Sequence, residues 1–242
     1  MKLLLILSIV IVQAAFAQTT PDYAKETRWA TQVEDTLMDG DSVWLSANNH
    51  EFLSIFTPSE SDTKKTAIIV HGLGAHPDWV QVIQPLRVVL TEKGFNTLSI
   101  QVPVLANGVD ADQYEPLFNK ANHRITAAIN YLKAQGFEAN TLIAHSLGSV
   151  MSAHYLANNQ HPFKKFTAIG MPGLAVEYLT KIDIPVLDLY GVDDIEPVLS
   201  SVKARANASS KNKNYHQKMV NADHFFNEKD DLLIDTVSAW LN

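Results

Sequence analysis

Residues 142–150 read LIAHSLGSV, and this stretch decides between two descriptions of the chain. The apolar run up to Ala144 is typical of a buried strand, and residues 147–158 have the composition of a helix. Ser146 therefore stands at a tight turn between them, with the small residues Ala144 and Gly148 on either side. A serine nucleophile needs such a turn, because it must stand exposed while the strand and the helix pack closely beside it. A serine that only caps a helix is the alternative.

Strands and helices alternate on both sides of this turn. We expect strands at 66–70, 95–102, 140–144, 166–170, 185–190 and 215–220, and helices at 21–38, 78–93, 115–135, 147–158, 174–181, 196–208 and 228–241. Apolar strands that alternate with helices predict an α/β domain, with a mostly parallel sheet covered by helices on both faces. Residues 42–46 and 51–56 flank a turn, which predicts an antiparallel hairpin at one edge of the sheet. The connections are short, so we expect little or no cap domain.

Residues 1–17 have the features of a secretory signal peptide. Lys2 supplies a positive charge, residues 3–15 are mostly apolar, and residues 15–17 form an A-x-A cleavage site. The apolar run is shorter than the roughly 20 residues of a comfortable membrane span. We therefore expect cleavage, a single domain over residues 18–242, no stable membrane span in the mature chain, and a periplasmic or secreted protein. A retained anchor is the alternative.

The composition argues against several classes of partner and cofactor. The 242 residues include 26 acidic and 19 basic side chains, for a net charge of −7, and no cysteine. Phosphate binding needs clustered Lys and Arg, so we expect no nucleic-acid partner. The histidines at positions 50, 71 and 76 lack a ligand spacing such as H-x-x-x-H, so we expect no metal site. The core must be stable without disulfides.

A loop that could hold an oxyanion follows the first parallel strand. Residues 71–74 read HGLG and come directly after the strand at 66–70, at the edge where functional residues of an open α/β sheet gather. Glycines there permit close backbone approach, so an N–H of this loop can complete an oxyanion hole with the N–H after the nucleophile. This assigns the N–H groups of Leu73 and Leu147. A glycine turn without this role is the alternative.

An acid and a base are expected after two later strands. Asp194 stands three residues after Gly191, at the end of the strand at 185–190, and we prefer it as the carboxylate that orients a histidine. Asp193 is the alternative. His224 follows the last strand, and an unperturbed imidazole titrates near pH ~6.5, which suits a general base. Each of these residues, taken alone, could also be an ordinary solvated loop residue.

The order Ser146, Asp194, His224 is that of the α/β-hydrolase superfamily, which the chain resembles over nearly all of its mature length. It is similar above all to an uncharacterised bacterial α/β-hydrolase-like group, through the segments HGLGAHPDW, LSIQVPVL, AHSLG, LDLYG and ADHFF. The resemblance implies the fold and a Ser-Asp-His triad, and it implies no substrate. Ala144 departs from the first glycine of the G-x-S-x-G pattern, as it does in some lipases of the superfamily.

These features favour a serine hydrolase of carboxylesterase type that acts on an ester of a small or medium acyl group. It would need no cofactor, and its partner would be a small-molecule acyl substrate. A peptidase, a thioesterase and a non-catalytic binding module of the cell envelope are the alternatives. We expect residues 104–114 and 171–178 to line the pocket, with an apolar wall of Pro103, Val104, Leu105, Met171 and Leu174. The sequence specifies neither the acyl length nor the oligomeric state.

Overall fold

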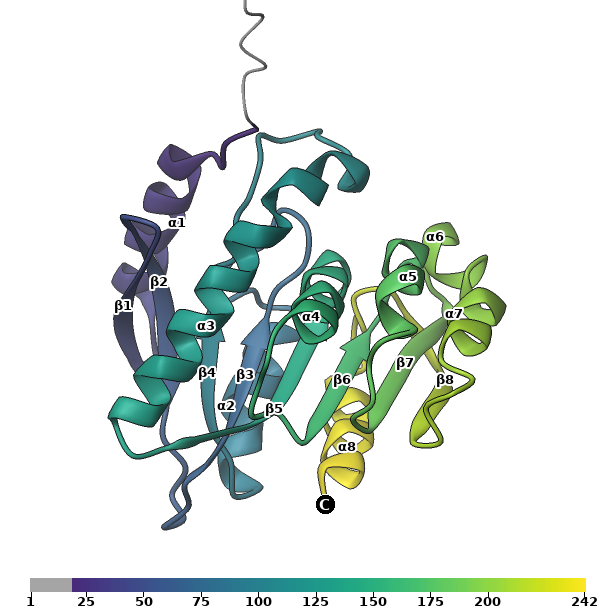
Figure 1. The fold of residues 1–242 in the computed structure, drawn as a ribbon. Coiled ribbons are helices and arrows are strands. Elements are labelled where there is room, and N and C mark those ends of the chain that lie inside the picture. The colour runs from purple at the N-terminus through teal and green to yellow at the C-terminus, as the bar shows by residue number, and fades with distance from the viewer. Residues whose placement is uncertain (1–18) are drawn as a thin grey trace, which may run out of the picture.

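The computed structural model describes residues 19–242, so the signal peptide expected at residues 1–17 lies outside it and stays a prediction. Eight strands form one sheet in the order β1-β2-β4-β3-β5-β6-β7-β8 (Figure 1). Their bounds are β1 Asp41–Ala47, β2 His50–Thr57, β3 Lys65–Val70, β4 Asn96–Ile100, β5 Glu138–His145, β6 Lys165–Ile169, β7 Val186–Asp193 and β8 Tyr215–Asp223. β1 and β2 pair antiparallel, as do β2 and β4, and all other pairs are parallel. This confirms the mostly parallel sheet and its N-terminal hairpin.

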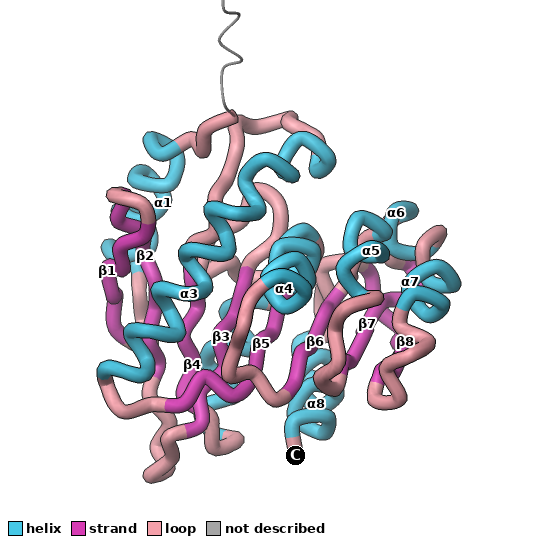
Figure 2. Tube along the Cα trace, viewed as in Figure 1, coloured by secondary structure: helices cyan, strands magenta, loops and turns pink. Residues whose placement is uncertain are grey.

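Helices cover both faces of the sheet (Figure 2). Their bounds are α1 Tyr23–Thr36, α2 Ile83–Glu92, α3 Phe118–Ala134, α4 Leu147–Asn158, α5 Val176–Leu179, α6 Glu196–Leu199, α7 Val202–Ala208 and α8 Asp230–Leu241, with 3₁₀ turns η1 Ala111–Leu117 and η2 Gly173–Ala175. α3 and α4 lie on one face, and α2 and α8 lie on the other. The connections that follow β6 and β7 contain only the short helices η2, α5, α6 and α7, as expected for a fold with little or no cap domain.

Alternation along the central strands explains why both faces are apolar. In β3, Ile68 and Val70 pack into the core under α3 and α4, whereas Ala67 and Ile69 pack into the core under α2 and α8. Successive side chains of a strand point to opposite faces, so a strand buried on both faces must be apolar throughout. The continuous apolar runs of the sequence therefore predicted this sheet.

Three predicted helices differ from the observed ones by more than two residues at an end or by an interruption. The helix expected at 78–93 begins only at Ile83, because Val82 has a positive φ of 65° that no α-helix accommodates. The helix expected at 115–135 begins at Phe118, after a 3₁₀ turn that contains Pro116. The helix expected at 196–208 is two short helices, α6 and α7, separated at residues 200 and 201. No helix among residues 19–242 has both the length and the apolar character needed to cross a bilayer.

Buried ions fasten α1 to the rest of the fold. The Glu26 carboxylate, 4% exposed, accepts two hydrogen bonds from Arg124 of α3 at 2.9 and 3.2 Å, and it pairs with His50 at 3.0 Å. The Lys25 ammonium donates to the Leu105 carbonyl at 3.1 Å and to the Asn107 amide oxygen at 2.7 Å. A buried charge requires such partners, so these contacts determine where α1 packs.

Candidate active site

Ser146 lies at a strained turn between β5 and α4. Its backbone has φ 52° and ψ −126°, a conformation that costs a non-glycine residue free energy and is found mainly at functional sites. A Cβ on Gly148 would lie 2.2 Å from the His71 carbonyl oxygen, so only glycine fits there. Ala144 is fully buried between Val70 of β3 and Ala168 of β6. Its methyl group therefore fits where the strict motif has a glycine.

A continuous chain of hydrogen bonds joins the three residues that the sequence singled out. Ser146 Oγ lies 2.9 Å from His224 Nε2, and His224 Nδ1 lies 2.5 Å from Asp194 Oδ1. His224 and Asp194 are 5% and 6% exposed, so water is largely excluded from this chain. The backbone N–H groups of Ile195 and Gly191 donate to the Asp194 carboxylate at 2.8 and 3.2 Å and hold it in place.

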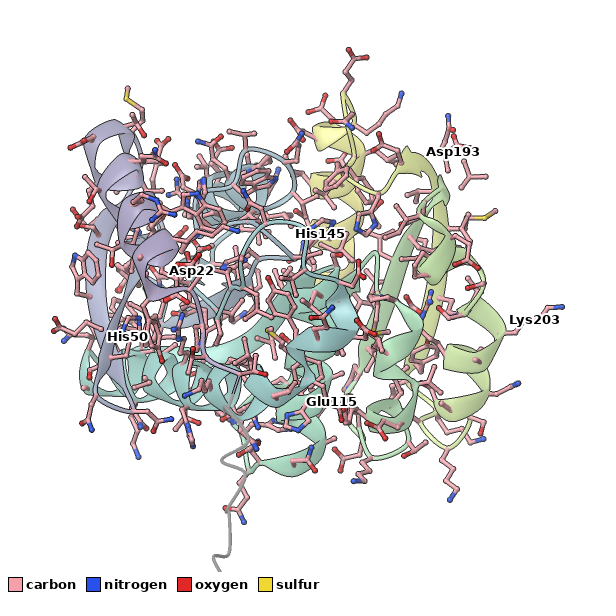
Figure 3. All side chains as sticks on the ribbon, turned by 90° about the horizontal axis from the view of Figure 1, so that it is seen from above. Asp22, His50, Glu115, His145, Asp193 and Lys203 are labelled. Atoms are coloured by element: carbon pink, nitrogen blue, oxygen red, sulfur yellow. The ribbon has the colours of Figure 1, made fainter. Side chains whose placement is uncertain are left out.

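The other two acidic residues near the end of β7 lie elsewhere. Asp193, the alternative acid, is exposed, and Figure 3 shows it at the periphery of the strand ends, away from His145. Asp188 is fully buried and bonds Arg205, Tyr215 and Gln217. Asp194 is therefore the carboxylate that contacts His224.

The two expected oxyanion donors lie beside the serine. Leu73 and Leu147 line the same cavity as Ser146. Leu147 is the first residue of α4, and the first N–H groups of a helix have no acceptor within it. Among residues 19–242 the Leu73 N–H has no hydrogen-bond acceptor. Two backbone donors are thus free beside the nucleophile, and their role as an oxyanion hole stays a prediction.

His71, the first residue of the HGLG segment, is uncharged and holds the loop of residues 71–74 in place. Its side chain is fully buried, and burial lowers its pKa to about 3. As the neutral tautomer it donates from Nδ1 to the Gly72 carbonyl at 2.9 Å and accepts the Val102 N–H at Nε2 at 3.1 Å. These bonds fix the loop that carries Leu73. Both ring nitrogens of His71 thus have hydrogen-bond partners within the protein.

His145, the residue before Ser146, is a buried side chain that the sequence analysis did not single out. Its Nε2 donates to the His224 carbonyl at 2.9 Å, and the two imidazole rings lie 4.9 Å apart. Burial, together with the nearby His224, lowers the pKa of His145 to about 4. His145 therefore stays neutral at physiological pH and adds no charge beside His224. A histidine directly before the serine was the sequence signal for this contact.

A cavity of about 630 Å³ opens beside Ser146. Its walls come from the loop before η1, the segment after β6 and the helix α6, with the lining residues Leu73, Asp110, Ala111, Asp112, Ser146, Leu147, Pro172, Gly173, Leu174, Ile195, Pro197, Ser200 and Ser201. Both expected segments, 104–114 and 171–178, contribute to it. Of the expected apolar wall only Leu174 lines this cavity, because Val104, Leu105 and Met171 are buried.

No three His, Asp or Glu side chains among residues 19–242 converge as metal ligands would. His50 pairs with Glu26, and His76 packs its ring against Trp29 and Trp79 at 5.7 and 5.3 Å. The histidines that the sequence drew attention to thus have other contacts in the fold.

We expect Gly170→Ala to lower kcat by about 10²-fold, because a displacement of a catalytic group by about 1 Å has that effect. Gly170 follows β6 with a φ of +57°, and a Cβ there would lie 2.9 Å from His224 Cε1 and Nδ1. Gly136 is the matched control, since it has a φ of +81° with no atom within 4 Å of its would-be Cβ. Urea unfolding should show similar stability losses in both variants, whereas kcat should fall only in Gly170→Ala. An equal loss of kcat in Gly136→Ala would contradict the steric reason.

Solved structures with this fold include several esterases. The chain is 14% identical to the Pyrococcus furiosus esterase Pf2001, with a TM-score of 0.70, covering 86% of this chain and 94% of that one. It is 15% identical to Est1E from Butyrivibrio proteoclasticus, with a TM-score of 0.65 and coverage of 83% and 97%. An alpha-beta serine hydrolase homologue from Coxiella burnetii is 17% identical, with a TM-score of 0.64 and coverage of 84% and 99%. At these identities the likeness establishes the α/β-hydrolase fold.

No curated protein matches the sequence. A family model described as "Protein of unknown function (DUF3530)" matches residues 4–116 and 106–242, which together span nearly the whole chain. The sequence had indicated an uncharacterised α/β-hydrolase-like family, and both comparisons confirm it. The chain belongs to the DUF3530 family and has the α/β-hydrolase fold.

Proposed function

We propose that this protein is a serine hydrolase of carboxylesterase type. The observation that carries the proposal is the buried chain of hydrogen bonds from Ser146 Oγ through His224 to Asp194, with the serine held at a positive φ. A binding module has no need for a strained serine bonded to a histidine that is itself bonded to a buried carboxylate. The esterases among the proteins of the same fold support an ester as substrate.

In the proposed reaction, Ser146 Oγ attacks the acyl carbonyl carbon while its proton passes to His224 Nε2. The N–H groups of Leu73 and Leu147 stabilise the oxyanion of the tetrahedral intermediate. His224 then gives the proton to the leaving alcohol oxygen, and the acyl group stays on Ser146. His224 next takes a proton from water, whose oxygen attacks the acyl carbonyl carbon. His224 returns this proton to Ser146 Oγ as the bond between Oγ and the acyl carbon breaks, which releases the carboxylic acid and restores the serine. No metal or organic cofactor takes part in these steps.

Asp194 and His145 are the two ionisable side chains beside the His224 ring, and they act differently on the imidazolium that forms during this cycle. The Asp194 carboxylate accepts the Nδ1–H and stabilises the imidazolium that forms. His145 is 4.9 Å away and stays uncharged, so it adds no repulsion to that imidazolium. The site therefore stabilises a positive charge at one ring only, which is the ring that must carry the proton. Export to the periplasm or the cell exterior, expected from residues 1–17, stays part of the proposal.

A fluorophosphonate probe tests the proposal, because it labels only a serine that is activated as a nucleophile. We expect purified protein to be labelled at Ser146, as located by mass spectrometry, and Ser146→Ala to lose both labelling and hydrolysis of p-nitrophenyl butanoate. Urea denaturation should show that the free energy of unfolding of Ser146→Ala equals that of the wild type to within about 0.5 kcal/mol. Folded wild-type protein that is neither labelled nor active would favour the binding module of the cell envelope.

A further inference from the structure

A second, smaller cavity continues the one beside Ser146. It has a volume of about 90 Å³ and shares three lining residues with the catalytic cavity, Ala111, Asp112 and Leu174. Its remaining walls are Glu115, Phe118, Glu177 and Tyr178, from η1, α3 and α5. A substrate that reaches past Leu174 from Ser146 therefore enters this second cavity, which we call the distal cavity.

Two aromatic side chains form the inner part of the distal cavity. Phe118 and Tyr178 are 4% and 9% exposed, and their rings meet edge to face with centroids 6.3 Å apart. Burial raises the pKa of Tyr178, and the nearby carboxylates of Glu177 and Glu115 raise it further. A buried tyrosine thus lines a space that is also lined by these carboxylates.

The charged residues that line the distal cavity are all acidic. Asp112, Glu115 and Glu177 take part in none of the ion pairs among residues 19–242. No Lys or Arg lines either the distal or the catalytic cavity, and Lys181, at the end of α5, lines a different cavity. Figure 3 shows Glu115 on the face viewed from above, on the α3 side of His145. A cationic ligand in these two cavities is therefore not repelled by a lining Lys or Arg side chain.

We propose that the distal cavity binds an ammonium or quaternary ammonium group of the substrate, so that the enzyme prefers esters with a cationic end. This inference rests on the proposed esterase function. Aromatic rings attract cations through their electron-rich faces, and the carboxylates supply the compensating charge. The three carboxylates are exposed, so the attraction must weaken as salt is added. An anionic end group is repelled by the same three carboxylates.

Matched pairs of esters test the proposal, since a trimethylammonium end and a tert-butyl end have the same shape and differ in charge. One series of p-nitrophenyl esters carries these ends on acyl chains of increasing length, and one series of butanoyl esters carries them on the alcohol. We expect the cationic member to have the higher kcat/KM by about tenfold at one chain length of one series. The ratio should fall towards one in 0.5 M salt. Equal kcat/KM at every length in both series would overturn the proposal.

Single substitutions locate the effect. Glu177→Gln and Glu115→Gln should each lower the preference for the cationic ester, measured as its kcat/KM divided by that of the tert-butyl ester, about threefold. Glu60→Gln is the control, because it removes an equally exposed carboxylate from the loop before β3, at the opposite end of the strands. A preference that falls as much in Glu60→Gln would show that net charge alone attracts the cation, and would overturn the subsite.

The test separates this proposal from the proposed function. Labelled Ser146 and hydrolysed tert-butyl esters without any preference for the cation would refute the subsite alone. If neither labelling nor hydrolysis occurs, equilibrium binding of tetramethylammonium decides on the subsite, measured by NMR line shifts of its methyl protons. Binding that Glu177→Gln weakens would support the cation subsite, and absence of binding would refute it.

Discussion

Asp194→Asn should lower kcat for ester hydrolysis by about 10⁴-fold, while Asp193→Asn should keep kcat within about twofold of the wild type. Asp194 lies 2.5 Å from His224 Nδ1 and is nearly buried, whereas Asp193 is exposed. An amide at position 194 cannot stabilise the imidazolium and favours the wrong tautomer of His224. The measurement is kcat and kcat/KM of both variants with one p-nitrophenyl ester.

The two variants control for each other, since each removes one negative charge from neighbouring positions. The Asp194 side chain also accepts the N–H groups of Ile195 and Gly191, so urea unfolding must show that the Asp194→Asn protein is folded. A larger loss of kcat at position 193 than at 194 would contradict the assignment of the acid.

We expect Arg205→Met to lower the free energy of unfolding by about 3–5 kcal/mol, the effect of removing one partner from a buried ion pair. Arg205 and Asp188 are both fully buried, and Arg205 Nε donates to Asp188 Oδ2 at 2.8 Å. Without the guanidinium, the Asp188 carboxylate keeps only Tyr215 and Gln217 as donors to its bonded oxygen. Urea denaturation followed by tryptophan fluorescence measures the change.

The double variant Asp188→Asn with Arg205→Met is the control for a buried unpaired charge. Because the asparagine is neutral, it should regain much of the stability that Arg205→Met loses. Arg205 also donates to Ser201 Oγ at 2.5 Å, and Ser201 lines the catalytic cavity, so KM should rise in both variants. A double variant no more stable than Arg205→Met would show that packing of the Arg205 side chain, and not its charge, carries the effect.

The sequence predicted the sheet well because apolar runs and their order are local information. Ile68 and Ile69 are apolar since β3 is buried on both faces, and any such strand is recognised from its own residues.

The predicted start of α2 was wrong because a side-chain contact in the folded protein, and not the local sequence, determines where this helix begins. Asp78 pairs with Arg87 at 2.5 Å, and this contact folds the chain before Ile83 into a turn although its residues suit a helix.

The candidate site was predictable where chemistry imposes a residue type at a strand end. Ser146, Asp194 and His224 each follow a strand, and parallel strands bring these ends together. The pocket wall was not predictable, because Val104 and Leu174 are equally apolar in the sequence and only the packed fold buries one and exposes the other. His145 was missed for the same reason, since its partner His224 lies 79 positions later in the chain.

The anchoring of α1 determines when this helix can reach its final position. Glu26 bonds Arg124, which lies 98 positions later, and Lys25 bonds the Leu105 carbonyl, 80 positions later. A ribosome makes the chain from its N-terminus, so neither partner exists when α1 is first synthesised. The first helix of the described chain must therefore wait, with Lys25 and Glu26 still in water, until more than half of the protein has been made. Docking of α1 is consequently a late event in the assembly of this fold.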